Sequence, residues 1–277
     1  MLTFVEALSL AGDRNKQNDD ALGFARGCAW VFDGATDLDD APLSGAASDA
    51  SWLAHHASAF FHAEAGKTDP RTLIRAASVA AREDFARIAD GVAFERWKSP
   101  IASVVYCTET ARGVEGVALG DCRVFALGAD EAVAEAGPPP AHADHETALA
   151  ATQTDADKPL LARTQTIAML RALRASQNQS GGGWTFCLDP HCADHAVAWR
   201  LDLARPAHVL LCTDGFAALA DRYRAYDGAG LVRAALAKGL HALGEELRAI
   251  EAEDAASARH PRFKRSDDAT AVLMRLS

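Results

Sequence analysis

The sequence contains no apolar run that approaches the ~20 residues a membrane-spanning helix needs. Residues 1–10 have no basic start and carry Glu6 within their apolar stretch, so they do not predict a signal peptide. Basic residues are outnumbered, with 28 Lys+Arg against 38 Asp+Glu and a net charge of −10, and they are dispersed. Proteins that bind the nucleic-acid backbone normally show a basic patch. We therefore expect neither a membrane nor a nucleic-acid partner.

Cysteine pairs with metal-ligand or redox spacing are also missing. The six cysteines are spread along the chain without a CxxC motif, and most of them lie in apolar runs. A free thiol in such a run behaves as a small core residue. A chain of 277 residues does not need disulfides to stabilise a core. We therefore predict reduced thiols and a cytoplasmic protein.

The sequence shows no internal repeat, no low-complexity segment and no alternating strand–helix pattern. Predicted strands and helices come in separate runs, which favours antiparallel sheets flanked by helices, an α+β layered protein. Residues 142–159 are polar and predicted to be weakly structured, and the strands within 101–127 are predicted to be antiparallel neighbours. Helices are expected at 46–63, from Asp69-Pro70 to 88, at 160–174 and at 230–251. Strands are expected at 3–10, 28–32, 101–107, 113–119, 122–127, 184–188, 195–199, 208–212 and 269–276.

Aspartates stand at the ends of several predicted strands. Taken singly, an Asp-Gly pair after a strand is usually a turn. Taken together, strand ends can converge on one edge of a sheet, where several carboxylates repel one another unless a cation neutralises them. Oxygen ligands of this kind suit Mg²⁺ or Mn²⁺ rather than zinc. The residues concerned are Asp19, Asp20, Asp33, Asp121, Asp214, Asp267 and Asp268.

Five short motifs carry these aspartates in a fixed order. They are NDDA from Asn18, VFDG from Val31, GDCR from Gly120, CTDGF from Cys212 and DDATAV from Asp267. This ordered set resembles the protein phosphatase 2C family, the metal-dependent serine/threonine phosphatases, from about residue 9 to residue 275. The resemblance implies a four-layer sandwich of two central antiparallel β-sheets flanked by α-helices. It also implies a single catalytic domain over 1–277, with a flap or insertion at about 138–182.

The resemblance implies two metal ions, Mg²⁺ or Mn²⁺, with a place for a third. Asp33 would bridge the two ions, and the Gly34 carbonyl would help to bind the second. Asp214 and Asp267 would complete the first metal site.

The remaining roles are implied in the same way. Asp19 and Asp20 would serve the second metal site, directly and through water. Asp121 would hold the third ion together with Asp214. Arg14 would grip the phosphate, and the catalytic residues would thus be Asp33, Asp214 and Arg14.

The implied activity is hydrolysis of phosphoserine and phosphothreonine in proteins by attack of a metal-bridging water. The implied partners are a phosphorylated protein substrate and a cognate serine/threonine kinase, in bacterial signalling. Two alternatives stay open. One is a pseudophosphatase, a regulatory binding domain without turnover. The other is a phosphatase of small phosphorylated metabolites.

The sequence departs from the family pattern at several positions, as expected of a divergent bacterial-type member. Asp19-Asp20 stands where the family usually has Glu-Asp. Arg14 is displaced by about one residue from the usual arginine, and Lys16 is a weaker stand-in. No histidine follows Asp33 until His55, so the leaving alcohol would take its proton from metal-bound water.

The other polar clusters of the sequence do not predict a metal-binding or phosphate-binding site. His191-Cys192 with His195 fits no standard zinc spacing, and a solvated turn is the simpler interpretation. His142 and His145 are interpreted as parts of a polar loop. Residues 181–183 are three glycines that precede a predicted strand rather than a helix, so they lack the geometry of a phosphate-binding loop.

Overall fold

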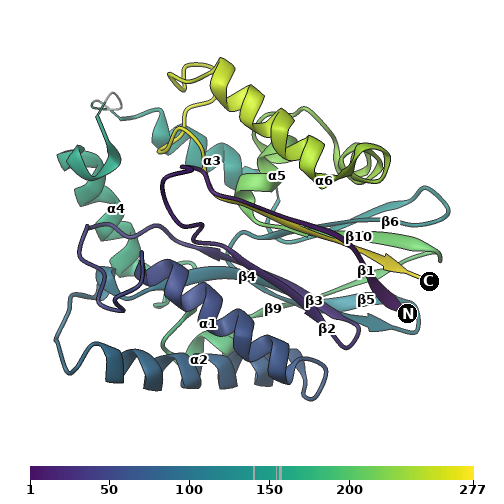
Figure 1. The fold of residues 1–277 in the computed structure, drawn as a ribbon, viewed down its shortest axis with the longest axis horizontal. Helices are drawn as coiled ribbons and strands as arrows, with labels where there is room; N and C mark the ends of the chain where they lie inside the picture. Colours follow the sequence, from purple (N-terminus) through teal and green to yellow (C-terminus); the bar gives the residue numbers. More distant parts are fainter. Residues whose placement is uncertain (140, 154, 156–157) are drawn as a thin grey trace.

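Two antiparallel β-sheets lie face to face, with helices covering both outer faces (Figure 1). The computed structural model of the chain describes residues 1–139, 141–153, 155 and 158–277. Helices α5 and α6 pack on one sheet, and α1 and α2 pack on the other. The predicted four-layer α+β sandwich is therefore confirmed.

We call the two sheets A and B. Sheet A contains, in order, β1 (Leu2–Leu10), β11 (Ala269–Leu276), β10 (Ala207–Cys212), β6 (Arg123–Leu127) and β7 (Val133–Ala136). Sheet B contains, in order, β2 (Ala21–Ala25), β3 (Cys28–Gly34), β4 (Ile101–Thr110), β5 (Gly113–Leu119) and β9 (Val197–Asp202), with β8 (Phe186–Cys187) paired to β4. The α-helices are α1 (Asp49–Glu64), α2 (Pro70–Ile88), α3 (Ala141–Ala150), α4 (Thr164–Ser176), α5 (Asp214–Asp221) and α6 (Gly228–Glu253). Short 3₁₀ segments lie at η1 (Arg96–Lys98), η2 (Leu160–Ala162) and η3 (Pro190–His195).

The core consists of three apolar layers, and alternate side chains of strand β3 belong to two of them. Ala29 and Val31 pack between the sheets, whereas Trp30 and Phe32 pack against α1. Successive side chains of a strand point to opposite faces. Asp33 therefore falls on the same face as Val31, at the end of the gap between the sheets.

The helix starts follow the sequence signals. Asp69 is the N-cap of α2 and accepts a 3.1 Å hydrogen bond from the amide of Thr72, with Pro70 in the first turn, as predicted. Ser48 caps α1 and accepts a 2.9 Å bond from the amide of Ser51. The start of α1 lies beside the end of β3, because a Cβ on Gly34 would lie 3.1 Å from the carbonyl oxygen of Ala50.

One predicted strand neighbour is wrong. Strands β4 and β5 pair antiparallel as expected, but β6 leaves them and pairs with β10 in sheet A. The crossing occurs at Gly120, whose φ of +82° favours glycine. A Cβ there would lie 2.1 Å from the Oγ of Ser103, so the chain turns tightly against β4 before it changes sheets.

Several other predictions need correction. Residues 141–150, within the stretch predicted to be weakly structured, form helix α3, which packs against α5 through ion pairs rather than through an apolar stripe. The predicted strand at 195–199 is shifted: His195 ends η3, and the strand, β9, begins at Val197. The Asp-Gly pair after β10 opens α5 and is not a turn. Strands β2 and β7 and helix α5 were not predicted. Positions 140, 154, 156 and 157 of the predicted insertion lie outside the described residues.

None of the helices in the described part of the chain combines the length and apolar composition needed to cross a membrane. All six cysteines are free and buried.

Candidate active site

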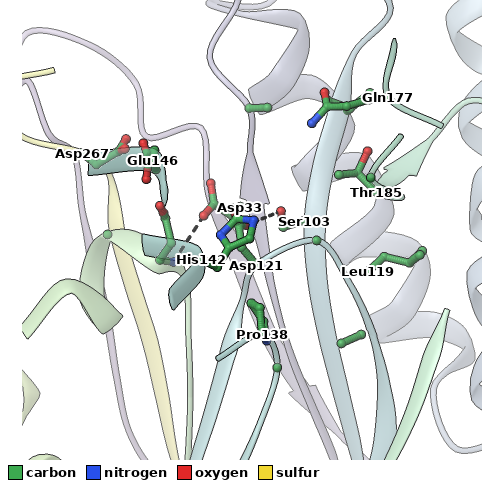
Figure 2. A pocket seen from close by; sticks show the side chains of 18 of the residues that line it. Asp33, Ser103, Leu119, Asp121, Pro138, His142, Glu146, Gln177, Thr185 and Asp267 are labelled. Carbon is green, nitrogen blue, oxygen red and sulfur yellow. Dashed lines mark hydrogen bonds between the residues drawn. The ribbon is translucent and has the colours of Figure 1, made fainter. Parts of the chain in front are cut away.

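The acidic residues of both sheets meet at one end of the sandwich. Asp33 ends β3, Asp121 lies between β5 and β6, Asp214 opens α5 after β10, and Asp267 precedes β11. All four line one cavity of about 1120 Å³, into which α3 contributes Glu146 (Figure 2). The structure therefore brings four of the seven aspartates that the sequence singled out into one cavity.

Asp33 and Asp214 form the centre of this cluster. The amide of Asp214 donates to Oδ2 of Asp33 at 3.4 Å, so the two residues lie side by side. Burial, and then the charges of Asp214, Asp20 and Asp121, raise the pKa of Asp33 well above its usual range. Burial with the charges of Asp121 and Asp267 raises the pKa of Asp214 to about 6. The carboxylates thus repel one another strongly.

Asp20 lies behind this pair in the protein interior. Its Oδ2 accepts a 2.9 Å hydrogen bond from the hydroxyl of Thr213, which itself accepts one from the amide of Thr270 at 3.0 Å. Its Oδ1 is buried and has no hydrogen-bond partner within the described residues. Burial, followed by the charge of Asp268, raises the pKa of Asp20 well above its usual range. This orphaned oxygen is a feature that a cation would satisfy.

The neighbouring Asp19 and Asp268 tie the N-terminal loop to β11. Both oxygens of Asp268 are used: Oδ1 accepts from the amide of Gly12 and Oδ2 from the amide of Asp19, each at 2.7 Å. The Asp19 carboxylate accepts from the hydroxyl of Ser48. Burial raises the pKa of Asp19 to about 6, although the Ser48 bond opposes this shift. Of the adjacent pair Asp267-Asp268, only Asp267 lines the cavity.

Asp121 is held by the hydroxyl of Ser103, which donates to its Oδ1 at 2.5 Å (Figure 2). Ser103 lies in β4 directly opposite Asp33 in β3. The register between β3 and β4 therefore sets the relative positions of Asp33 and Asp121.

Two cationic side chains that sequence reasoning missed also face the cluster. Lys264 donates to Oδ1 of Asp267 at 2.6 Å, and its charge lowers the pKa of Asp267 although burial acts in the opposite sense. Arg222, at the end of α5, donates to Oε2 of Glu146 at 2.5 Å. Burial, with the charges of Asp214 and Asp267, raises the pKa of Glu146 to about 7. The sequence feature that could have indicated the Lys264–Asp267 pair is their spacing, because Lys264 precedes Asp267 by three residues.

The chemistry of the donor set fits a hard divalent cation. The donors are carboxylate oxygens, they raise one another's pKa, and one of them is orphaned. Gly34 adds a close backbone approach, because a Cβ there would lie 2.3 Å from the carbonyl oxygen of Asp19. As the side chains stand, no three His, Cys, Asp or Glu residues of the described chain are grouped to hold a metal ion. The carboxylates must turn towards a shared ion before they can bind it.

The arginine expected to bind phosphate lies elsewhere. Arg14 and Lys16 are exposed on the loop after β1, and neither lines the cavity. Arg174 of α4 does line it, donating to the carbonyl of Thr36 at 3.2 Å, and burial lowers its pKa to about 10. A role for Arg14 stays a prediction.

The histidine cluster of η3 gathers no set of metal ligands. The His195 ring stacks on Trp184 with centroids 3.3 Å apart, and Nδ1 of His191 lies 2.9 Å from Oδ2 of Asp194. Cys192 is fully buried. The described residues around η3 contain no group of three metal-ligating side chains.

Comparison with known proteins places this geometry in a known fold. No protein-family model matches the sequence, and no curated protein matches it. Solved structures do match over the full chain. The serine/threonine phosphatase PstP/Ppp of Mycobacterium tuberculosis is 17% identical with a TM-score of 0.56, covering 100% of this chain and 99% of its own. The PPM Ser-Thr phosphatase MsPP of Mycobacterium smegmatis, in complex with cacodylate, is 18% identical with a TM-score of 0.54, covering 99% and 100%.

A further structure is the catalytic domain of the serine/threonine protein phosphatase PstP in complex with two manganese ions. It is 16% identical with a TM-score of 0.54 and covers 99% of both chains. At these identities the likeness establishes the fold. The chain has the fold of the PPM-type serine/threonine phosphatases, and the acidic cluster lies at one end of its sandwich.

Proposed function

We propose that the chain is a metal-dependent phosphatase that hydrolyses phosphoserine and phosphothreonine in proteins, a divergent member of the protein phosphatase 2C family. One observation carries the proposal. Aspartates from both sheets converge on a single cavity in a fold that the similar solved structures use for serine/threonine phosphatases. In this proposal the substrate is a phosphorylated protein, and its cognate kinase is the second partner.

The residues that would hold the ions follow from their positions. Asp33 would be shared between two Mg²⁺ or Mn²⁺ ions, in accord with the two manganese ions of the similar structure. Asp214 and Asp267 would serve one ion. The second would take Asp19, Asp20 and the carbonyl of Gly34, and Asp121 would hold a third. Such cations lower the pKa of water and neutralise charge on a phosphoryl group.

The chain's own residues would organise the rest of the site. Thr213 orients Asp20, Ser103 orients Asp121, and Asp268 holds the loop that carries Asp19. Residues 1–277 would act as one catalytic unit, with about 138–182 as a flap beside the cavity. The free, buried thiols support a reducing compartment such as the cytoplasm.

A regulatory pseudophosphatase is the second candidate. The observation that favours it is the pairing of Asp267 with Lys264, because the ammonium occupies a carboxylate that a catalytic metal would need. Such a domain would keep the fold and bind a partner without turnover. A phosphatase of small metabolites is the third candidate.

The test is hydrolysis of p-nitrophenyl phosphate with and without Mn²⁺. Turnover should require the metal, stop on chelation by EDTA and return when Mn²⁺ is added back. Asp33→Asn should abolish it, because the substitution removes the charge shared between the ions, while Asp40→Asn on an exposed loop should not alter it. Persistent activity after exhaustive chelation would refute the proposal. Metal binding without turnover would select the regulatory alternative, and comparing phosphopeptides with small phosphate esters would decide the substrate class.

A further inference from the structure

Arg222 combines burial with incomplete hydrogen bonding at the wall of the acidic cavity. Its side chain is only 9% exposed, and its Nε is buried without a hydrogen-bond partner in the described chain. Burial tends to lower its pKa, but the charges of Glu146 and Asp214, followed by that of Asp267, outweigh burial and raise it. The guanidinium therefore lies close to the proposed metal ligands and keeps an unused donor.

A guanidinium presents its donors as a planar fork that matches the oxygens of carboxylates and phosphates. In Arg222 the Glu146 carboxylate engages one arm of that fork, the Nη2 donor, at 2.5 Å. The Nε donor beside it stays unpaired. A buried donor without a partner is unfavourable, and a tetrahedral anion could accept from Nε and Nη together.

Glu146 belongs to a helix that has little else to hold it in place. Within α3, only Ala150 is fully buried. The helix is joined to the end of α5 by two ion pairs, Arg222 with Glu146 and Arg224 with Asp144 at 3.1 Å. The Arg224–Asp144 pair is exposed to solvent, whereas the residues of the Arg222–Glu146 pair line the cavity. Breaking the inner pair would free Arg222, and α3 would keep the exposed ion pair and the buried Ala150.

We propose that Arg222 binds the phosphoryl group of the substrate and that Glu146 is an internal anion that occupies Arg222 until a phosphomonoester displaces it. This inference rests on the proposed function and assigns its phosphate-binding residue. The other arginines that line the cavity already have protein partners. Arg14 is exposed outside the cavity lining, and Arg174 already donates to a backbone carbonyl.

The experiment compares two isosteric substitutions on α3. Glu146→Gln removes the charge that competes for Arg222, and Asp144→Asn removes the matching charge from the exposed pair. Binding of inorganic phosphate to the Mg²⁺-loaded protein is measured by calorimetry and by inhibition of p-nitrophenyl phosphate hydrolysis. Glu146→Gln should tighten phosphate binding about tenfold, the effect of one charge-assisted hydrogen bond. Asp144→Asn should leave it unchanged.

Arg222 itself is tested with a folding control. Arg222→Lys keeps the charge but loses the fork, so KM should rise about tenfold with a smaller change in kcat. The double variant Glu146→Gln with Arg222→Gln keeps a neutral hydrogen-bonded pair. It should unfold close to the wild-type temperature yet bind phosphate as weakly as Arg222→Lys or more weakly.

The outcomes separate this inference from the proposed function. Equal phosphate affinity in wild type and Glu146→Gln, or equal changes in phosphate affinity in Glu146→Gln and Asp144→Asn, would overturn this inference. Glu146 would then only hold α3 against α5. A raised KM in Arg14→Ala but not in Arg222→Lys would transfer the role to Arg14. If the wild type hydrolyses nothing but Glu146→Gln still binds phosphate more tightly, the proposed function fails and the anion site stands.

Discussion

Asp268→Asn should loosen the N-terminal half of the site, although Asp268 does not line the cavity. Its two carboxylate oxygens accept from two different amides, those of Gly12 and Asp19, both at 2.7 Å. An asparagine has one acceptor oxygen, so only one of these bonds can survive. The other amide would then face an NH₂ group, donor against donor. The substitution therefore preserves the shape of the side chain and removes one of its two accepted hydrogen bonds.

The magnitude follows from the bond that is lost. A hydrogen bond to a charged group contributes about 1.5–3 kcal/mol. In a protein of this size each kcal/mol corresponds to about 2–4 °C in Tm. We therefore expect a decrease in Tm of about 3–12 °C. One effect opposes it: the charge of Asp268 raises the pKa of both Asp19 and Asp20, so its removal relieves repulsion.

The pH separates the two effects in the metal-free protein. At pH 5.5 Asp19, with a pKa of about 6, is largely protonated and little repulsion is left to relieve, so the full decrease in Tm should be seen. At pH 7.5 the decrease should be smaller. The assay is thermal unfolding in EDTA at both pH values, with Asp13→Asn as control, since the Asp13 carboxylate accepts hydrogen bonds from Asn15 within the same exposed loop. A wild-type Tm at pH 5.5, or a larger decrease at pH 7.5 than at pH 5.5, would refute this reasoning.

Two further predictions concern charge in the cluster. Asp19 and Asp214 have pKa values of about 6 in the folded protein, above the usual 3.8, so the folded state binds protons more tightly and stability falls as pH rises from about 4 to above 6. The Tm of the metal-free wild type should therefore be higher at pH 5 than at pH 7, and Mg²⁺ should remove the difference. A Tm that rises between pH 5 and pH 7 in EDTA would contradict these pKa shifts. Lys264→Gln removes the ammonium that competes for Asp267 and should tighten Mn²⁺ binding about tenfold in calorimetry, about 1.4 kcal/mol. The control Lys98→Gln, whose lysine pairs with Asp39 away from the cluster, should leave Mn²⁺ binding unchanged. Weaker Mn²⁺ binding in Lys264→Gln would show that Lys264 supports the site.

The meeting of four aspartates in one cavity could be expected from the sequence because it depends on short-range patterns. An apolar run followed by Asp-Gly marks the end of a buried strand, as at Asp33. The same pattern at Asp214 gave the right position, although the pair opens a helix instead of a turn. Strand ends on one edge meet by topology, so the carboxylates could be expected to converge.

The cationic half could not be predicted because it depends on tertiary contacts. Arg222 and Glu146 belong to segments that read as solvated surface, and only the packing of α3 on α5 makes them a pair. No periodicity distinguishes Asp267 from Asp268 either. Which of two adjacent carboxylates faces the cavity depends on the path of the loop that enters β11.

The hydrogen bond from the amide of Asp19 to Asp268 spans 249 residues, and β1 pairs with β11 along its length. The site is therefore assembled from segments that lie far apart in the sequence. Contacts of such long sequence separation form only after the intervening chain has been organised, which makes their formation slow. During synthesis the carboxylates of the first strands must wait for β11 before they meet their partners. A growing chain that already contains Asp33 would thus have no complete cluster, and the cluster should form only when β11 has docked.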